Sequence, residues 1–129
     1  MDEQRSSCTW GSGGKNQIIY SCSGVGSNVG QLANEAACRL TLEGYGGGSC
    51  LAGLGGGIDK LIGMGMAADE RVVIDGCPVA CAKTIMDNRR LPIDHYVVIT
   101  ELGITKTLGP AFNERDVQTV IDAVKNSSR

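Results

Sequence analysis

Short runs of β-branched and other apolar residues alternate along this chain with stretches in which apolar residues recur at helical spacing. The strands predicted from these runs are Ile18–Tyr20, Ser49–Leu54, Arg71–Asp75 and His95–Thr100. The predicted helices run from residue 27 or 28 to near residue 44, from about 58 to 68, from 79 to 88, and onward from 113 or 114. Strands and helices that alternate at such short intervals favour parallel strands joined by right-handed crossovers. We therefore expect a three-layer α/β domain with an open parallel sheet of about four strands and helices on both faces, Rossmann-like or flavodoxin-like.

Length and charge narrow the class of protein. A chain of 129 residues can bury a hydrophobic core large enough to fold without a stabilising metal or disulfide. The formal net charge is −2, the isoelectric point is about 5.3, and the longest basic run is the pair Arg89-Arg90. We therefore expect neither nucleic acid nor an anionic membrane as a main partner. The sequence also lacks apolar runs of the length of a signal peptide or membrane span, so we expect a cytoplasmic protein with reduced thiols.

The first residues differ in composition from the rest. Residues 1–16 are polar, rich in glycine and serine, and without periodicity, which predicts a flexible N-terminal extension before a domain over residues 17–129. Cys8 lies in this extension and has no predicted role. Ten of the 19 glycines fall between Gly44 and Gly65, where apolar residues at regular intervals favour an ordered strand, loop and helix over a flexible linker.

Cysteines follow or lie within three of the predicted strands. Cys22, Cys50 and Cys77 are each expected at the carboxyl edge of the sheet, where open α/β folds bind their ligands. Cys81 follows Cys77 by four residues in a helix expected to begin around Pro78, which would place both thiols on one helical face. Four such thiols can reach one tetrahedral centre, and thiolate sulfur is a preferred ligand of Zn²⁺. The sequence therefore predicts a zinc site made of Cys22, Cys50, Cys77 and Cys81.

The same residues leave alternatives open. Cys77 at a helix start could be the nucleophile of a thiol or persulfide redox protein, with Cys81 or Cys22 as its partner. Four cysteines could also hold an iron–sulfur cluster, and free cysteines are often small buried apolar residues. Asp75 could accept hydrogen bonds around the metal ligands or hold the turn after its strand.

Two further side chains are expected to take no part in the site. Cys38 lies opposite the apolar stripe of its helix and is given no role. His95 opens the fourth predicted strand, so it should lie at the opposite edge of the sheet from the thiols. No catalytic residue is predicted, and whether the protein is an enzyme stays open.

Three motifs in order resemble the DGC-domain family, which is associated with zinc binding. They are Cys22-Ser23-Gly24 with residues 27–33, the segment from Cys50 to Leu54, and the segment from Ile74 to Lys83, which contains the Asp75-Gly76-Cys77 triplet. The resemblance extends from about Ile18 to Lys125. It implies that Cys22, Cys50, Cys77 and Cys81 are the metal ligands, the set already reached from topology, and it carries no reaction with it. Together these observations predict a zinc-binding protein, used in metal handling or sensing, with a metal ion as its partner.

Overall fold

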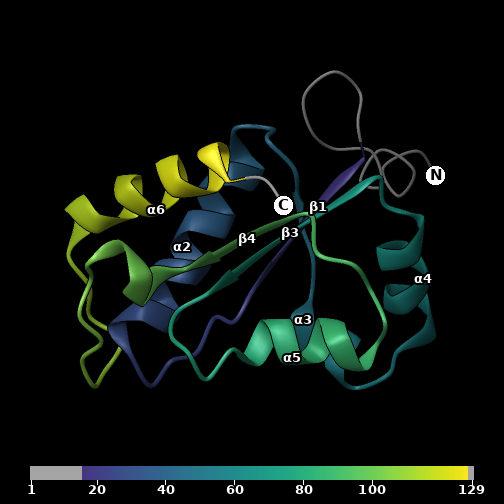
Figure 1. Ribbon diagram of the computed structural model, residues 1–129, viewed down its shortest axis with the longest axis horizontal. Coiled ribbons are helices and arrows are strands. Elements are labelled where there is room, and N and C mark those ends of the chain that lie inside the picture. The colour runs from purple at the N-terminus through teal and green to yellow at the C-terminus, as the bar shows by residue number, and fades with distance from the viewer. Residues whose placement is uncertain (1–15, 128–129) are drawn as a thin grey trace.

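The structure, a computed structural model, describes residues 16–127. Its centre is a sheet of four strands in the order β2-β1-β3-β4, with every neighbouring pair parallel. The strands are β1 (Gln17–Ser21), β2 (Gly47–Gly48), β3 (Glu70–Asp75) and β4 (His95–Val98). The predicted open parallel sheet is thus confirmed (Figure 1).

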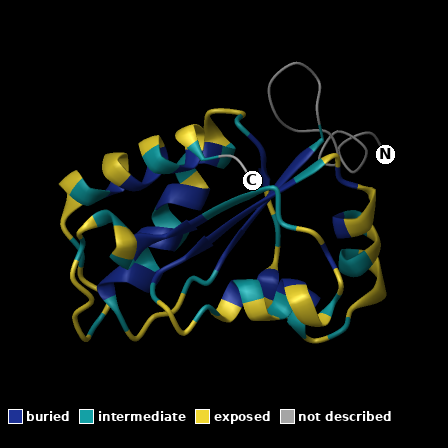
Figure 2. Ribbon diagram, viewed as in Figure 1, coloured by how far each residue is buried: buried dark blue, intermediate teal, exposed yellow. Residues whose placement is uncertain are grey.

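Helices cover both faces of this sheet (Figure 1). One face carries α2 (Asn28–Leu42) and α6 (Glu114–Asn126). The other carries α3 (Leu51–Gly55), α4 (Asp59–Ala67) and α5 (Cys81–Asn88). A short 3-10 helix, η2 (Ile99–Leu102), follows β4. The three predicted layers are therefore present, and Figure 2 shows the buried strands between the partly exposed helices.

The core follows from the alternation of side chains along the buried strands. In β1, Ile19 packs towards α2 and α6, whereas Ile18 and Tyr20 pack towards the opposite helices. All five residues of β1 are buried, as expected for a central parallel strand covered on both faces. The apolar stripes of α2 and α6 complete one of the two clusters.

The two long helices begin where capping residues predicted them. Ser27 precedes α2, and its hydroxyl accepts the backbone N–H of Gly30 at 3.1 Å. Asn113 precedes α6, and its side-chain oxygen accepts the backbone N–H of Arg115 at 3.0 Å. Each cap satisfies a backbone donor that has no partner inside the helix.

Two predicted elements were wrong near the cysteines. The strand over Ser49–Leu54 does not form: β2 covers only Gly47–Gly48, and residues 51–55 form α3, which buries Leu51 and Leu54. The helix predicted from residue 79 begins instead at Cys81, because Ala80 has left-handed backbone angles (φ 57°, ψ 48°) that interrupt a helical path.

The strand order changes direction beside β1, which has β2 on one side and β3 on the other. In α/β sheets the crevice beyond the carboxyl ends at such a point is the usual ligand site. Gly76 follows β3 there and lies against α2: a Cβ on it would be 2.8 Å from the backbone of Val29, so only glycine fits. The loop after β3 is thereby pressed onto the first turn of α2.

The predicted extension over residues 1–16, with Cys8, lies outside the described residues except for Asn16. The backbone N–H of Asn16 donates to the carboxylate of Asp69 at 2.9 Å. Among the described helices, none is both long and apolar enough to cross a membrane.

Candidate functional site

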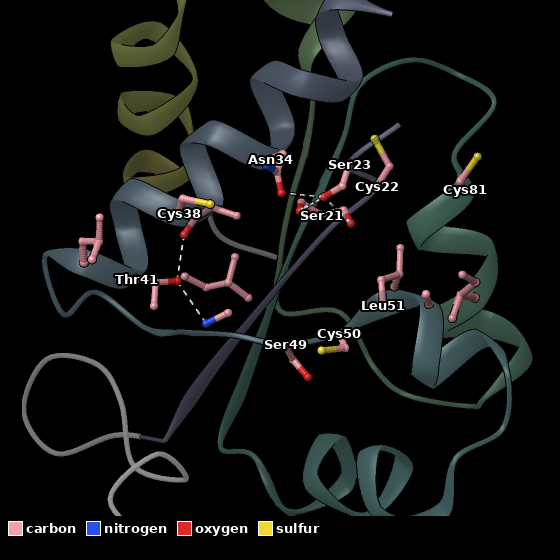
Figure 3. Close-up of a pocket in the computed structure, with 16 residues that line it drawn as sticks. Ser21, Cys22, Ser23, Asn34, Cys38, Thr41, Ser49, Cys50, Leu51 and Cys81 are labelled. Atoms are coloured by element: carbon pink, nitrogen blue, oxygen red, sulfur yellow. Dashed lines mark hydrogen bonds between the residues drawn. The ribbon is translucent and has the colours of Figure 1, made fainter. Parts of the chain in front are cut away.

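A cavity of about 830 Å³ opens at the carboxyl edge of the sheet, between α2 on one side and α3 and α5 on the other. Four cysteines from four separate segments line it: Cys22, Cys38, Cys50 and Cys81 (Figure 3). The rest of the lining is apolar or uncharged, with no Asp, Glu, Lys, Arg or His among the described residues that form it.

The cavity exists because β2 is so short. Its two residues pair only with Ile18 and Ile19 of β1. Ser49 then donates its N–H to the carbonyl of Ile19 at 3.0 Å, and the chain turns away into α3. Beside Ser21, where a longer strand would continue, the space is open and lined by Ser21 itself. The cavity therefore occupies the space that a longer β2 would fill. It extends from the helices on one face of the sheet to those on the other.

Hydroxyl groups shape the α2 side of this cavity. The Ser21 and Ser23 hydroxyl oxygens lie 2.6 Å apart, and the Ser23 hydroxyl donates to the side-chain oxygen of Asn34 at 3.0 Å (Figure 3). Ser23 has a positive φ of 54°, uncommon for a residue other than glycine. These bonds tie the loop after β1 to the middle of α2.

Cys22 comes directly after β1 and is half-buried. Its N–H donates to the carbonyl of Ile74 at 3.1 Å, and its sulfur accepts the N–H of Gly76 at 3.3 Å. Burial raises the pKa of the Cys22 thiol, and the charges of Asp75 and Cys81 add to that effect, although backbone hydrogen bonds oppose it. The neutral form of the Cys22 thiol is therefore favoured.

Two exposed cysteines stand at helix starts across the cavity. Cys50 is the residue before α3, and Cys81 is the first residue of α5. In Figure 3 they lie on the side of the cavity formed by the shorter helices. Both thiols can be reached by an incoming ligand without displacing the core.

Asp75 fixes the start of α5. It is fully buried, and its carboxylate accepts the N–H groups of Ala82 at 2.8 Å and Lys83 at 3.0 Å. The Tyr96 hydroxyl donates to the same carboxylate at 2.9 Å. Asp75 thus holds the turn and the neighbouring Cys81 in place, which is one of its two predicted roles. Its role around metal ligands stays a prediction.

Cys77 lies apart from the cavity. It is half-buried against the cluster beneath α2 and α6, and its sulfur accepts a hydrogen bond from the ammonium of Lys106 at 3.4 Å. It is not among the lining residues. The prediction that Cys77 and Cys81 share a helical face is wrong, because α5 begins only at Cys81. The cavity brings together three of the four predicted ligands, Cys22, Cys50 and Cys81.

The donor set fits a thiophilic metal by its chemistry, since soft thiolate sulfurs are what Zn²⁺ and similar ions take up. In the described part of the chain, however, no three side chains of His, Cys, Asp or Glu are grouped closely enough to hold a metal ion. The four-thiolate centre therefore stays a prediction that requires movement of at least two cysteines.

Cys38 is the lining cysteine to which no role was assigned from the sequence. It is exposed on α2, and it lines the cavity together with Asn34, Ala37 and Thr41. These four residues follow the i, i+3, i+4, i+7 spacing of one helical face, and this spacing was the available signal. Lys106 had no such signal, because it lies 29 residues after Cys77 in an irregular loop.

His95 lies where it was predicted, at the amino end of β4 and away from the cavity. One ring nitrogen is 2.7 Å from the carbonyl oxygen of Ser127, and the other is 2.8 Å from the Glu70 carboxylate. Its contacts are structural and place it outside the thiol site.

Comparisons with known proteins agree with the resemblance seen in the motifs. The family model of the DGC domain matches residues 18–124. A Pseudomonas aeruginosa protein named anaerobic and virulence modulator AnvM is 32% identical over 101 residues, which cover 78% of this chain and 76% of that protein. No solved structure matches.

Proposed function

The chain belongs to the DGC domain family, and from this premise we propose that it binds a Zn²⁺ ion through the thiolates of Cys22, Cys50, Cys77 and Cys81. The observation that carries the proposal is that Cys22, Cys50 and Cys81, from three separate segments, line one cavity at the ligand-binding edge of the sheet. Such a gathering of thiols in an otherwise uncharged cavity favours a soft cation over other ligands.

Forming the four-thiolate centre requires the cysteines of the cavity to move closer together, since no three described candidate ligands are grouped there, and requires Cys77 to join them by movement of the loop between β3 and α5. This loop spans residues 76–80, and its Val79 is 67% exposed, so little packing holds its tip in place. When Cys77 turns towards the cavity, it gives up the hydrogen bond from Lys106 and its packing against the cluster beneath α2 and α6. Metal binding and loop movement are thereby linked.

The proposed role is handling or sensing of the metal, not support of the fold. Two hydrophobic clusters already cover both faces of the sheet without any contribution from Cys50 or Cys81. Both thiols are exposed, so an ion there can be reached by exchange partners. A regulatory use of the metal is compatible with a relative that is named as a modulator.

The test is the metal content of protein purified anaerobically, without added thiol, for the wild type and single serine variants. We expect about one zinc per chain in the wild type and loss of most of it in each of Cys22→Ser, Cys50→Ser, Cys77→Ser and Cys81→Ser. Cys38→Ser is the matched control, since it removes an exposed thiol of the same cavity that is outside the proposed set. Wild-type protein that takes up no zinc would sink the proposal.

A role in handling also predicts that the metal-free protein remains folded. Far-ultraviolet circular dichroism before and after removal of zinc by a chelator should change little. Collapse of the helical signal would indicate a structural metal instead. If the protein contains iron and acid-labile sulfide and absorbs visible light, the site holds an iron–sulfur cluster instead of zinc.

One observation favours a second candidate function, a thiol redox protein with Cys77 as its nucleophile. The Lys106 ammonium beside the Cys77 sulfur is the kind of cationic neighbour found at reactive cysteines. This candidate predicts metal-free protein in which Cys77 is alkylated faster than the exposed Cys38, and in which Lys106→Met slows that alkylation. Equal rates at the two cysteines would count against it.

A further inference from the structure

The cavity at the carboxyl edge of the sheet has the size and position of a site for a small organic molecule. Its volume of about 830 Å³ lies within the usual range of such pockets. It lies beyond the ends of parallel strands, where open α/β sheets bind their ligands. Neither property depends on a metal ion, so the metal-free protein already offers this space.

Apolar side chains from several elements form much of the cavity wall. Ile19 belongs to β1, Leu51 to α3 and Ile85 to α5. Leu42, the last residue of α2, also lines the cavity and is 86% exposed, so most of its apolar surface is in contact with water. Reduced thiols add small, weakly polar groups to the same wall. A guest with an apolar body therefore gains free energy by removing this surface from water.

The lining also determines the charge of the guest. Among the described residues that form the cavity, none carries an ammonium, guanidinium, imidazole or carboxylate group. A charged group that enters such a place loses its water without gaining a partner. The cavity therefore favours an uncharged guest.

One chain of hydrogen bonds indicates which polar group the guest carries. The Ser23 hydroxyl donates to the side-chain oxygen of Asn34 at 3.0 Å, so the Ser21 hydroxyl, 2.6 Å away, donates to that of Ser23 (Figure 3). The Asn34 oxygen is thereby engaged, whereas its amide N–H groups have no acceptor among the described residues. Because Asn34 lines the cavity, a carbonyl oxygen of a guest can accept a hydrogen bond from it.

We propose that the cavity reversibly binds an uncharged, mainly apolar small molecule that carries a carbonyl group, with the carbonyl oxygen at the Asn34 amide. The apolar part of the guest lies against the wall that includes Leu42, Leu51 and Ile85. No covalent bond forms. This inference goes beyond the proposed zinc binding and does not rest on it, since it concerns the metal-free protein.

The experiment is a titration of metal-free protein with acetophenone, an uncharged ketone of fragment size, followed by amide proton–nitrogen correlation NMR with the thiols kept reduced. We expect saturable shifts with a Kd of about 1 mM or lower. The shifted amides should belong to the cavity lining, including those of Ser21, Cys50 and Cys81. The amide of His95, at the opposite edge of the sheet, should not shift.

Two analogues test the two features of the guest. Ethylbenzene has a methylene group in place of the carbonyl and should bind about fivefold more weakly, because it accepts no hydrogen bond from Asn34. 4-Acetylbenzoate adds a carboxylate and should bind at least about tenfold more weakly. The variant Asn34→Asp keeps an acceptor for Ser23 but lacks the amide donor, so acetophenone should lose its advantage over ethylbenzene.

Three phenylalanine variants test the cavity itself. Cys38 on α2 and Ala52 on α3 are exposed and line the cavity, so Cys38→Phe and Ala52→Phe each fill part of it. We expect about tenfold weaker binding of acetophenone in both. Ala67→Phe makes a similar change at an exposed helical site outside the lining and should bind as the wild type does. The correlation spectrum of each variant without ligand shows whether it is folded.

The possible results either support the inference or overturn it. Saturable shifts in the lining that weaken in Cys38→Phe and Ala52→Phe, but not in Ala67→Phe, support it. Folded wild type without such shifts, shifts centred elsewhere, or equal binding in the three phenylalanine variants overturns it. Equal binding of acetophenone and either analogue overturns it as well.

The metal content of the wild type keeps this inference separate from the zinc proposal. A wild type that takes up zinc but, when metal-free, shows no shifts with acetophenone overturns this inference alone. A wild type that binds acetophenone in the cavity but takes up no zinc supports this inference and overturns the zinc proposal alone.

Discussion

At the amino end of the sheet, charged side chains tie neighbouring segments together, whereas at the carboxyl end thiols and hydroxyls surround an open cavity. The amino end has the buried Arg71, whose guanidinium donates to the carbonyls of Gly65 and Ala68, both at 2.9 Å, and of Pro92 at 2.8 Å. The carboxyl end has Cys22, Cys50 and Cys81 around the cavity, without a charged residue in the described lining.

The difference between the two ends of the sheet indicates that the amino end stabilises the fold, whereas the carboxyl end leaves space for a ligand. Arg71 joins the end of α4, the start of β3 and the loop before β4, so one residue fixes three segments. At the other end, Asp75 is the buried carboxylate that orders a turn, and it does so beside the cavity. The amino end should therefore respond to substitution in stability, and the carboxyl end in ligand binding.

The largest expected effect is that of Arg71→Ala. The guanidinium lies 3.3 Å from the Asp94 carboxylate in addition to its three carbonyl acceptors, and its side chain is 9% exposed. Removal leaves buried carbonyls without a donor and should lower the free energy of unfolding by about 3–5 kcal/mol. Urea denaturation measures this change, and metal content per folded chain should not alter.

The control is Arg39→Ala. Arg39 also makes ion pairs, with Glu35 and Glu114, but its side chain is 39% exposed. Exposed pairs add little to stability, so this variant should unfold close to the wild type. If the two variants unfold at the same urea concentration, the claim that Arg71 stabilises the amino end of the sheet is contradicted.

The second effect concerns Asp75→Asn at the carboxyl end. The amide keeps one acceptor oxygen and turns a donor group towards an N–H or hydroxyl that needs an acceptor. We expect a loss of about 2–3 kcal/mol in unfolding free energy. The start of α5 is then held by fewer hydrogen bonds, which allows Cys81 to shift. Zinc affinity should therefore fall as well.

Tyr96→Phe separates these contributions. It removes one of the three hydrogen bonds to Asp75 and leaves both backbone bonds of α5 in place. The expected loss in unfolding free energy is about 1 kcal/mol, with zinc affinity retained. A large loss of zinc in this variant would show that Asp75 acts on the metal ligands by a route other than the helix start.

The fold was predictable from the sequence to a large extent, because its signals are local. β-Branched runs mark β1, β3 and β4, and the caps Ser27 and Asn113 mark the starts of the long helices. Parallel order then follows from the alternation of elements. The strand predicted at Ser49–Leu54 was wrong, because burial of Leu51 and Leu54 at helical spacing outweighs the strand-like look of so short a run.

The site was predictable only in outline. Strand ends place Cys22 at the correct edge, and Cys50 and Cys81 line the same cavity. The position of Cys77 depends on the left-handed turn at Ala80 and on Lys106, neither of which leaves a mark in the local sequence. The cavity itself arises from the early end of β2, a pairing limit that local residue patterns do not show.

A smaller effect is expected at Tyr20, in the centre of the sheet between the two ends. Its hydroxyl is buried and, among the described residues, has no hydrogen-bond partner. Tyr20→Phe should therefore raise the free energy of unfolding by about 1 kcal/mol near pH 7, since an unsatisfied polar group is removed. A loss of stability in this variant would mean that the hydroxyl does have a partner.

Tyr20 is also expected to make the free energy of unfolding depend on pH. Burial raises the pKa of Tyr20 from 10.0 to about 12, although the charge of Arg71 acts in the opposite direction. As pH rises from 10 towards 12, the unfolded chain loses this proton first, so the unfolding free energy falls by up to about 1.4 kcal/mol per unit. The Tyr20→Phe protein should lack this part of the decline in denaturation curves measured across that window.

The smallest effect is a difference in reactivity between cysteines of the same cavity. The raised pKa of Cys22 leaves less thiolate at neutral pH, and its half-buried sulfur is less accessible than that of the exposed Cys38. Iodoacetamide labelling of the metal-free protein, followed by peptide mass spectrometry at several pH values, should show Cys22 reacting more slowly than Cys38. The labelling rate of Cys22 should also begin to rise at a higher pH than expected for an ordinary exposed thiol. Because alkylation requires the thiolate, equal rates at neutral pH would mean that Cys22 is not held in its neutral form. The carboxyl end would then be more open than its hydrogen bonds to Gly76 and Ile74 imply.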